Sequence, residues 1–269
     1  MAICKTDAIV LRTYRHGETS KIAILYSKAF GKAKVMAKGA RNPKSRFGAA
    51  LEPMTEVAVV FYRREGREVH TLSQGDLIAP FSSLRSSLEK LGYASAIVEL
   101  TDHLAIYEEP NTALYHLLQA CLTGIERAPQ ELAEKFLWHF QLRIADLCGY
   151  RPQFARCVHC GRAVSGERPR FDLAGGGMVC EACLRGPLSG REDVAVRGSR
   201  YVDLHRESAA FLHKLQKTMP DEVERVVTQA RFREEIRDVL SAFLEHHTED
   251  RRRLRSLDFL AKVSESPSG

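Results

Sequence analysis

The chain has 269 residues, of which 44% are hydrophobic and 28% charged, a composition that excludes fibrous, collagen-like and largely disordered proteins. The net charge is +6 and unevenly distributed: residues 1–80 contain 14 Lys and Arg against 7 Asp and Glu, whereas residues 81–150 contain 5 against 9. Such asymmetry indicates a polyanion-binding module joined to a second part of different charge.

Neither a membrane segment nor an export signal is visible in the sequence. No stretch approaches the ~18 consecutive apolar residues of a membrane span, and residues 1–20 lack the apolar run and cleavage site of a signal peptide. We therefore expect a soluble protein of the cytoplasm without a membrane partner. Thiols stay reduced in that compartment, so clustered cysteines favour a metal over disulfides.

Residues 2–80 are expected to form a small β-barrel. Turn residues separate short segments that are rich in β-branched and aromatic side chains and that partly alternate between apolar and polar. These segments are residues 8–14, 21–27, 31–39, 55–64 and 67–75. Gly31 and Gly66 lie where tight turns would reverse the chain. Five or six short strands in about 80 residues fit an OB-fold, and they fit an SH3-like barrel equally well.

The most basic part of the predicted barrel is residues 31–48, which contain six cations and no acid. The six are Lys32, Lys34, Lys38, Arg41, Lys44 and Arg46. If residues 31–39 are a strand, its period of two places the three lysines on one face, where they would meet phosphates. We interpret the segment as a polyanion-binding site, with Phe47 as a stacking residue for an unpaired base. The alternatives are a solvated charged surface and a membrane surface, although no amphipathic basic helix is present.

Helical periodicity begins after Pro80. Residues 82–107 carry leucine and isoleucine at helical spacing after a serine cap candidate, and Asn111 can cap a second helix. Pro129 can occupy the first turn of a third helix, which Gly149 would end. Three consecutive helices of this kind predict a bundle.

Residues 150–190 interrupt the helical pattern with many glycines and four of the seven cysteines. The four are Cys157, Cys160, Cys180 and Cys183. Two C-x2-C pairs separated by nineteen residues are the pattern of a four-thiolate zinc site, since each pair presents two thiolates from one tight turn. Four protein ligands leave no open coordination position, so we expect structural Zn²⁺ that stabilises a loop-rich insert.

The alternatives for this quartet are four reduced cysteines without metal, or a redox pair. His159 lies within the first pair and could replace one ligand. Three arginines next to the cysteines could offset the charge of four thiolates; they are Arg156, Arg162 and Arg185. Two of the other cysteines, Cys121 and Cys148, lie in apolar helical patterns and are expected to be buried thiols.

Helical signals return near Ser208 and continue to Val263, so residues 191–263 are expected to complete the helical domain, with residues 264–269 as a frayed tail. A cluster of arginines lies late in this region, and we interpret it as the end of a helix, where cations favour the dipole. The cluster is Arg251, Arg252, Arg253 and Arg255.

No motif of a known catalytic chemistry is present. The sequence lacks the G-x4-G-K-[ST] phosphate loop, G-x-G-x-x-G after a strand, G-x-S-x-G, H-E-x-x-H and the zinc deaminase pattern. We therefore expect a protein that is not an enzyme. A nuclease whose carboxylates are brought together only by folding is the alternative.

The order of these features resembles the RecO family of DNA-repair proteins. Residues 7–48 (DAIVLRTYRHGETSKIAILYSKAFGKAKVMAKGARNPKSRFG) look like the first barrel strands and basic loop of that family. Residues 149–161 (GYRPQFARCVHCG) look like its junction into the zinc motif, and residues 255–260 (RSLDFL) like its C-terminal helix. The resemblance covers nearly the whole chain, and the combination and order of the motifs make it specific.

This resemblance implies an α+β multidomain protein: a basic OB-fold in residues 1–80, then a helical domain that starts at residues 81–149 and is interrupted by the zinc insert. It implies a recombination mediator of the RecF pathway that binds single- and double-stranded DNA, anneals complementary strands and is located in the cytoplasm with the nucleoid. Implied partners are RecR, the C-terminal tail of single-stranded DNA-binding protein and, indirectly, RecA. The family's DNA-binding cations correspond best to Lys34 and Lys38. A zinc-containing adaptor for RNA or transcription is the alternative.

Overall fold

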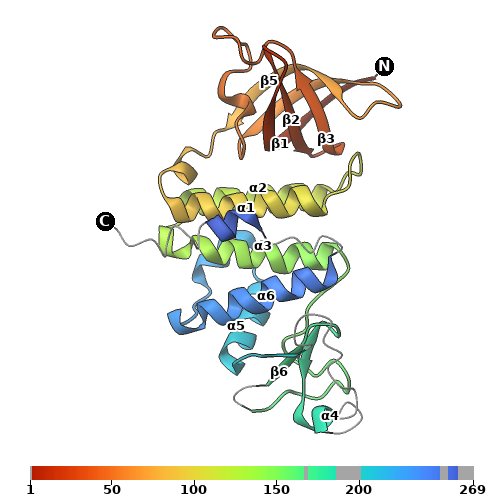
Figure 1. Ribbon diagram of the computed structural model, residues 1–269. Coiled ribbons are helices and arrows are strands. Elements are labelled where there is room, and N and C mark those ends of the chain that lie inside the picture. Colours follow the sequence, from red (N-terminus) through yellow and green to blue (C-terminus); the bar gives the residue numbers. More distant parts are fainter. Residues whose placement is uncertain (1, 167–168, 186–200, 249–253, 260–269) are drawn as a thin grey trace. The chain divides into compact units, whose positions relative to one another are not determined.

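The computed structural model describes the chain except for residues 1, 167–168, 186–200, 249–253 and 260–269 (Figure 1). Contacts between Cα atoms divide the chain into two compact units. The first unit comprises Met1–Leu137 and Leu254–Gly269, and the second Trp138–Arg253. No described helix is both long enough and apolar enough to cross a lipid bilayer.

The first unit begins with a closed five-stranded barrel. Its strands are β1 (Ala2–His16), β2 (Ser20–Ser27), β3 (Gly31–Ala37), β4 (Glu56–Arg63) and β5 (His70–Ala79). They follow the order β1-β2-β3-β5-β4, and β1 closes the barrel by pairing with both β2 and β4. Neighbouring strands are antiparallel except β3 and β5. The predicted β-barrel is confirmed, and its topology is that of an OB-fold.

Strand β1 is long enough to pair with both β2 and β4. Its first half pairs with β4 and its second half with β2, and the register shifts between Val10 and Arg12. Such a β-bulge bends a strand and increases its twist, which helps a short sheet to close. The barrel interior holds small and β-branched side chains, among them Ala23, Val35 and Val59.

The outer surface of β2 is partly covered within the same unit. Ile24 and Tyr26 alternate with the core residues Ala23 and Leu25, so they point outward, yet each is only 1% exposed. The Tyr26 hydroxyl donates a hydrogen bond of 3.2 Å to the backbone oxygen of Asn111. This part of the barrel surface is therefore packed against the chain that follows it.

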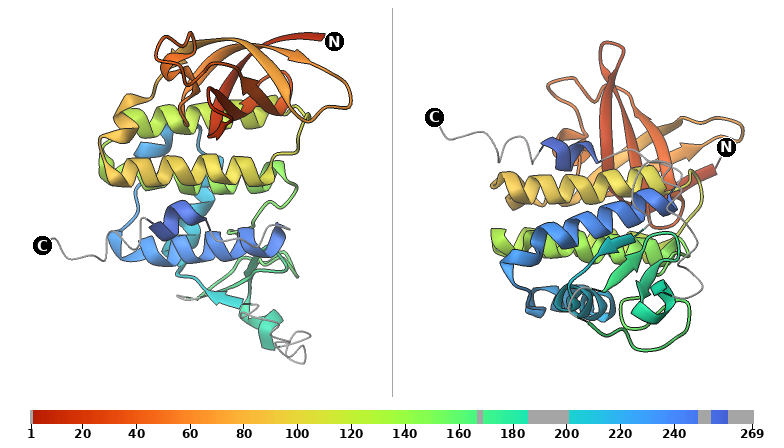
Figure 2. Two further views of the ribbon diagram at one scale, coloured as in Figure 1. Left: turned by 45° about the horizontal axis from the view of Figure 1, so that its top comes forward. Right: turned by 60° about the horizontal axis from the view of Figure 1, so that its bottom comes forward.

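Three helices follow the barrel: α1 (Leu88–Leu104), α2 (Thr112–Arg127) and α3 (Ala133–Leu147). The side chains of Ser87 and Asn111 cap the first two helices by accepting hydrogen bonds from backbone N–H groups. Gly149, with φ of +86°, follows the end of α3 as predicted. Figures 1 and 2 show α1 and α2 side by side. The boundary between the two units falls within α3.

The second unit combines helices with a small sheet. Its elements are β6 (Arg170–Asp172), β7 (Gly177–Val179), α4 (Glu181–Arg185), β8 (Tyr201–Asp203), α5 (Arg206–Lys217) and α6 (Arg233–His247). Both neighbours of β6 pair with it in the antiparallel sense, in the order β7-β6-β8. The third strand of this sheet comes from beyond residue 190, and strands of three residues give too short a pattern to be seen in the sequence.

Two expectations about the helical regions are wrong. Cys148 is exposed and not buried, because it follows the last turn of α3, whereas Cys121 is fully buried in α2. Arg255 does not end a helix but begins the helical residues 255–259, where its backbone N–H donates to Glu99. The other three arginines of that cluster and the tail 264–269 lie outside the described residues.

Candidate metal site and nucleic-acid interface

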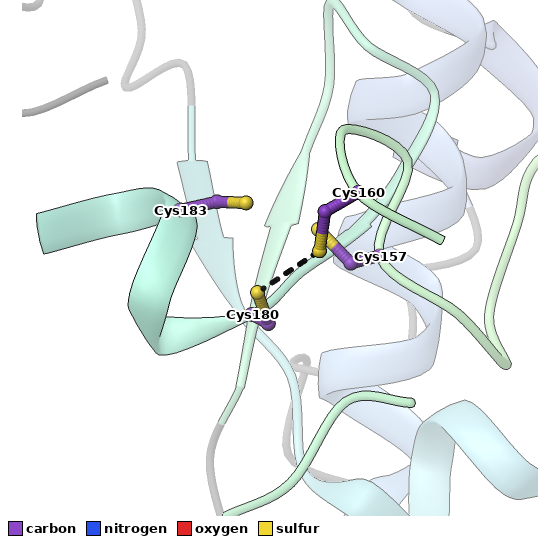
Figure 3. Close-up of side chains that lie close together, drawn as sticks. All are labelled: Cys157, Cys160, Cys180 and Cys183. Carbon is purple, nitrogen blue, oxygen red and sulfur yellow. Dashed lines mark hydrogen bonds between the residues drawn. The ribbon is translucent and has the colours of Figure 1, made fainter. Parts of the chain in front are cut away.

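The four predicted cysteines come together in the second unit (Figure 3). Their Sγ atoms all lie within 4.8 Å of one another, and those of Cys160 and Cys180 are 3.5 Å apart. Zinc–sulfur bonds of 2.3 Å in a tetrahedron place neighbouring sulfurs about 3.8 Å apart. The four thiols therefore have the donor chemistry and the approximate spacing of a tetrahedral metal site.

Local backbone structure explains how each pair is presented. Cys157 and Cys160 flank a tight turn in which the Gly161 N–H donates to Cys157 O at 2.9 Å, and Gly161 adopts φ of +71°. Cys180 directly follows β7, and Cys183 lies in α4 with its N–H donating to Cys180 O at 3.0 Å. Each C-x2-C pair thus forms the predicted knuckle.

The surroundings favour the thiolate form in the first pair. The backbone N–H of Arg162 lowers the pKa of the Cys160 thiol to about 6, and the Arg162 side chain also hydrogen-bonds this sulfur. The other two arginines make different contacts: Arg156 donates to Gly161 O at 3.2 Å, and Arg185 pairs with a glutamate of its own helix. Of the three arginines expected to offset the thiolate charge, Arg162 contacts a ligand sulfur.

The alternative ligand His159 is not part of the group of sulfurs. Its Nε2 lies 3.4 Å from Asp172 Oδ2. Cys157 and Cys180 are 2% and 8% exposed and pack with Val179 in a small apolar cluster. Because four protein ligands would fill a tetrahedral shell, the arrangement fits an ion that joins two turns of the chain and has no site for a substrate.

On the barrel, the basic stretch starts on β3 and continues into the turns that follow. Ala33, Val35 and Ala37 belong to the barrel core, so Lys34, which lies between the first two, points outward. Lys34 is half-buried. Four cations after it are exposed, and they are Lys38, Arg41, Lys44 and Arg46. The alternation in the sequence therefore predicted the face of β3 that carries Lys34.

Lys32 shares that face but is buried. Its Nζ lies 2.9 Å from Asp102 Oδ1, also donates to the backbone oxygen of Asp102, and stands 4.5 Å from the centre of the Tyr107 ring. With a side chain only 8% exposed, Lys32 already has its charge matched by a carboxylate of the same unit.

The interpretation of Phe47 as a stacking residue for an unpaired base is wrong. Its ring is 3% exposed and packs in the barrel core, with the Arg46 guanidinium 5.1 Å from its centre. A buried phenylalanine in a basic segment has the same sequence signature as an exposed one, because the core contact is made through residues distant in the sequence.

The sequence did not single out Arg12, which lies beside the basic stretch. In the antiparallel register Arg12 faces Ile24, and Ile24 faces Lys34, so the three form one row across β1, β2 and β3. The next row contains the exposed Tyr14. Strand order and the bulge before Arg12 create this row, and neither is visible in the sequence.

A further contact joins the segment after β3 to the β1–β2 turn. The Arg41 guanidinium donates to the backbone oxygens of Gly17 and Glu18 at 3.0 and 2.7 Å, and its N–H donates to Thr19 O at 2.9 Å. These bonds hold Arg41 against the β1–β2 hairpin, which also carries Arg15.

An OB-fold barrel with a basic segment, followed by helices and a four-thiolate site, defines a multidomain α+β protein of a type built around an oligonucleotide-binding module. Comparison with known proteins agrees. Residues 1–81 match the family model for the N-terminal part of recombination protein O, and residues 85–258 match that for its C-terminal part.

Similar full-length proteins carry the same family name. The chain is 35% identical to the DNA repair protein RecO of Pelotomaculum thermopropionicum, with 100% of this chain and 98% of the relative covered. It is 35% identical to that of Myxococcus xanthus, with 96% of each covered, and 34% identical to that of Salinibacter ruber, with 97% and 95% covered. The chain belongs to the RecO family of DNA repair proteins.

Proposed function

We propose that this chain is a recombination mediator that binds single- and double-stranded DNA on its barrel, anneals complementary strands and acts without catalysing a reaction. The supporting observation is the set of cations that β3 and the following turns present outside the barrel core: Lys34, Lys38, Arg41, Lys44 and Arg46. No acidic residue interrupts this set in the sequence between residues 31 and 48. Membership of a DNA repair family supports nucleic acid as the polyanion.

Annealing requires two polyanions to approach each other. Cations on the barrel would neutralise phosphates and release their condensed counterions, which lowers the repulsion between strands. Contacts to phosphates carry no sequence information, so binding should be indifferent to base sequence. Lys32 is paired with Asp102, so we do not expect it to contact DNA directly.

The metal is proposed to be Zn²⁺ held by Cys157, Cys160, Cys180 and Cys183. When bound, zinc would supply four strong bonds between the two turns, and so would stabilise the fold of this region. The residues around it hold the thiolates in place: Arg162 binds the Cys160 sulfur, and the Cys157 side chain is fixed by apolar packing.

Family membership also suggests the partners. We propose that the chain binds RecR and the C-terminal tail of single-stranded DNA-binding protein, and thereby helps to load RecA onto coated strands. Because its proposed substrate is chromosomal DNA, we propose that the chain is located in the cytoplasm with the nucleoid. The division into a DNA-binding barrel (1–80), a helical domain (81–149 and 191–263) and a zinc insert (150–190) is retained as part of this proposal.

The test is an annealing assay with strands coated by single-stranded DNA-binding protein, comparing the wild type with Lys34→Glu/Lys38→Glu. A matched control is Lys214→Glu/Lys217→Glu, which makes the same charge change at two exposed positions of α5. We expect the barrel variant to lose annealing and the control to keep it. Equal loss, or no loss, in both variants would contradict a barrel site.

The absence of catalysis is tested separately. Labelled DNA is incubated with the wild-type chain and Mg²⁺, because a two-metal nuclease depends on divalent ions. We expect intact strands after prolonged incubation. Cleavage that increases with protein concentration and is removed by a chelator would establish an enzyme instead.

A further inference from the structure

One carboxylate of the first unit contacts two cations of the barrel. Asp102 lies in the last turn of α1. Its Oδ2 is 2.8 Å from Nε of Arg12 on β1, and its Oδ1 is 2.9 Å from Nζ of Lys32 on β3. Two positive charges therefore share a single negative one, which leaves the group with a net positive charge.

The two cations differ in how firmly they are held. The Lys32 side chain is 8% exposed and that of Asp102 is 12% exposed, whereas the Arg12 side chain is 58% exposed. Lys32 is further fixed by its bond to the Asp102 backbone oxygen and by the ring of Tyr107. Asp102 and Lys32 thus form a buried pair, and Arg12 is the member that solvent and solutes can reach.

Arg12 is also placed beside the proposed DNA contacts. It lies in the same row across the sheet as Lys34, with Ile24 of β2 between them. A phosphate that approaches Lys34 along this row therefore comes near a guanidinium, which is the side chain best suited to bind phosphate oxygens in pairs.

We propose that Asp102 is an internal competitor for phosphate at Arg12. In the free chain Arg12 forms an ion pair with Asp102. When a DNA strand binds, Arg12 leaves the carboxylate and pairs with a phosphate of the strand. Asp102 remains neutralised by Lys32, so the exchange leaves no buried charge unpaired. This inference rests on the proposed function and adds Arg12 as a contact residue and Asp102 as its regulator.

The energetics permit such an exchange. An ion pair whose arginine is more than half exposed contributes little, because water and salt screen it, so breaking it has a small cost. By contrast, removing the partner of the buried Lys32 would cost much more. Competition from the Asp102 carboxylate therefore weakens DNA binding only modestly, and Asp102 stays paired with Lys32 when DNA binds.

The experiment measures the affinity of a fluorescein-labelled oligothymidylate for four chains: wild type, Asp102→Asn, Arg12→Gln and the double variant. Asparagine keeps an oxygen for Lys32 but loses the charge. We expect Asp102→Asn to bind about two- to fivefold more tightly and Arg12→Gln to bind more weakly. In the Arg12→Gln background, Asp102→Asn should not increase the affinity, because there is then no arginine for which Asp102 and phosphate compete.

The double variant separates exchange from a general effect of charge. An equal gain from Asp102→Asn with and without Arg12 would overturn the proposal, as would weaker binding by the single variant. Asp76→Asn, which removes a charge from an exposed position on β5 of the same barrel, is the matched control and should change affinity little.

Thermal melting of each variant shows whether it is folded. If Asp102→Asn is unstable, Arg12→Gln still decides the question, since it leaves the buried pair intact: unchanged affinity would overturn the proposal. Lys34→Glu/Lys38→Glu is measured alongside. No binding by the wild type would refute the proposed function, whereas binding that depends on Lys34 and Lys38 but not on Arg12 would refute this inference alone.

Discussion

The hydroxyl of Tyr115 on α2 donates a 2.8 Å hydrogen bond to the carboxylate of Glu56 on β4. Glu56 is 5% exposed, and its other described donor is the side-chain amide of Gln119, at 2.5 Å. Burial and the nearby carboxylate strongly raise the pKa of Tyr115, so the phenol stays protonated and remains a donor. A buried carboxylate that accepts hydrogen bonds from these two neutral donors thus links the barrel to α2 in the first unit.

Tyr115→Phe should therefore destabilise the chain. Removing one donor from a buried carboxylate leaves part of its charge without compensation, and the expected loss is about 1–3 kcal/mol in the free energy of unfolding. Tyr14→Phe, at an exposed position of β1, is the control and should be nearly neutral. Equal urea midpoints for both variants would contradict the role given to this bond.

Gly31 marks a second close contact, between the barrel and the loop that joins α1 to α2. It has φ of +66°, and a Cβ atom built on it would lie 2.1 Å from the backbone oxygen of Glu109. Gly17 has a similar φ of +59° but nothing within 4 Å. Both substitutions to alanine incur the cost of a left-handed residue, about 1–2 kcal/mol. We expect Gly31→Ala to lower the melting temperature well beyond Gly17→Ala; equal shifts would show that the contact is not tight.

The sequence predicted the features that depend on neighbours along the chain. The Asn111 cap and the two cysteine knuckles all follow from spacing within a few residues, and the structure contains each of them. The sequence also predicted that the two knuckles meet, because two C-x2-C pairs at this separation are typical of a single zinc site.

The features that the sequence missed depend on partners far along the chain. Lys32 was expected to face phosphates, but Asp102, seventy residues later, lies against it. Phe47 was expected at the surface and lies in the core. The sequence does not single out Arg12, since its position beside Lys34 requires the strand register of the folded barrel.

The metal site predicts a specific effect of cysteine substitution. Cys157→Ser should lower the zinc content of the purified chain and its melting temperature, because a lost ligand weakens the bonds that join the two knuckles. Cys148→Ser is the matched control, since this cysteine is exposed and lies outside the cluster. A full complement of zinc and unchanged melting in the Cys157 variant would contradict the proposed site.

Buried His139 predicts how stability depends on pH. Its side chain is 1% exposed, and burial lowers its pKa to about 4, although a hydrogen bond to the backbone oxygen of Leu215 opposes the shift. A lowered pKa means that the unfolded chain, titrating near 6.5, takes up the proton first. The stability contributed by neutral His139 is thus present above pH 6.5 and is lost as the pH falls toward 4.

This loss amounts to about 2 kcal/mol between pH 7 and pH 5. His139→Gln should remove that part of the pH dependence, even if it lowers stability at pH 7. His16→Gln, at an exposed position, should leave the dependence as in the wild type. Chemical unfolding at the two pH values is the measurement, and an unchanged difference in the His139 variant would contradict the assignment.

The salt dependence of binding tests the DNA site on the barrel most directly. The affinity of the wild type for a labelled single strand is measured over a range of salt concentrations, next to that of Lys34→Glu/Lys38→Glu. On a log–log plot each phosphate contact contributes a slope of about −0.7, so the variant should bind more weakly and its slope should be shallower by about 1.4. Wild-type affinity that does not change with salt, or an equal slope in the variant, would contradict a phosphate-binding barrel.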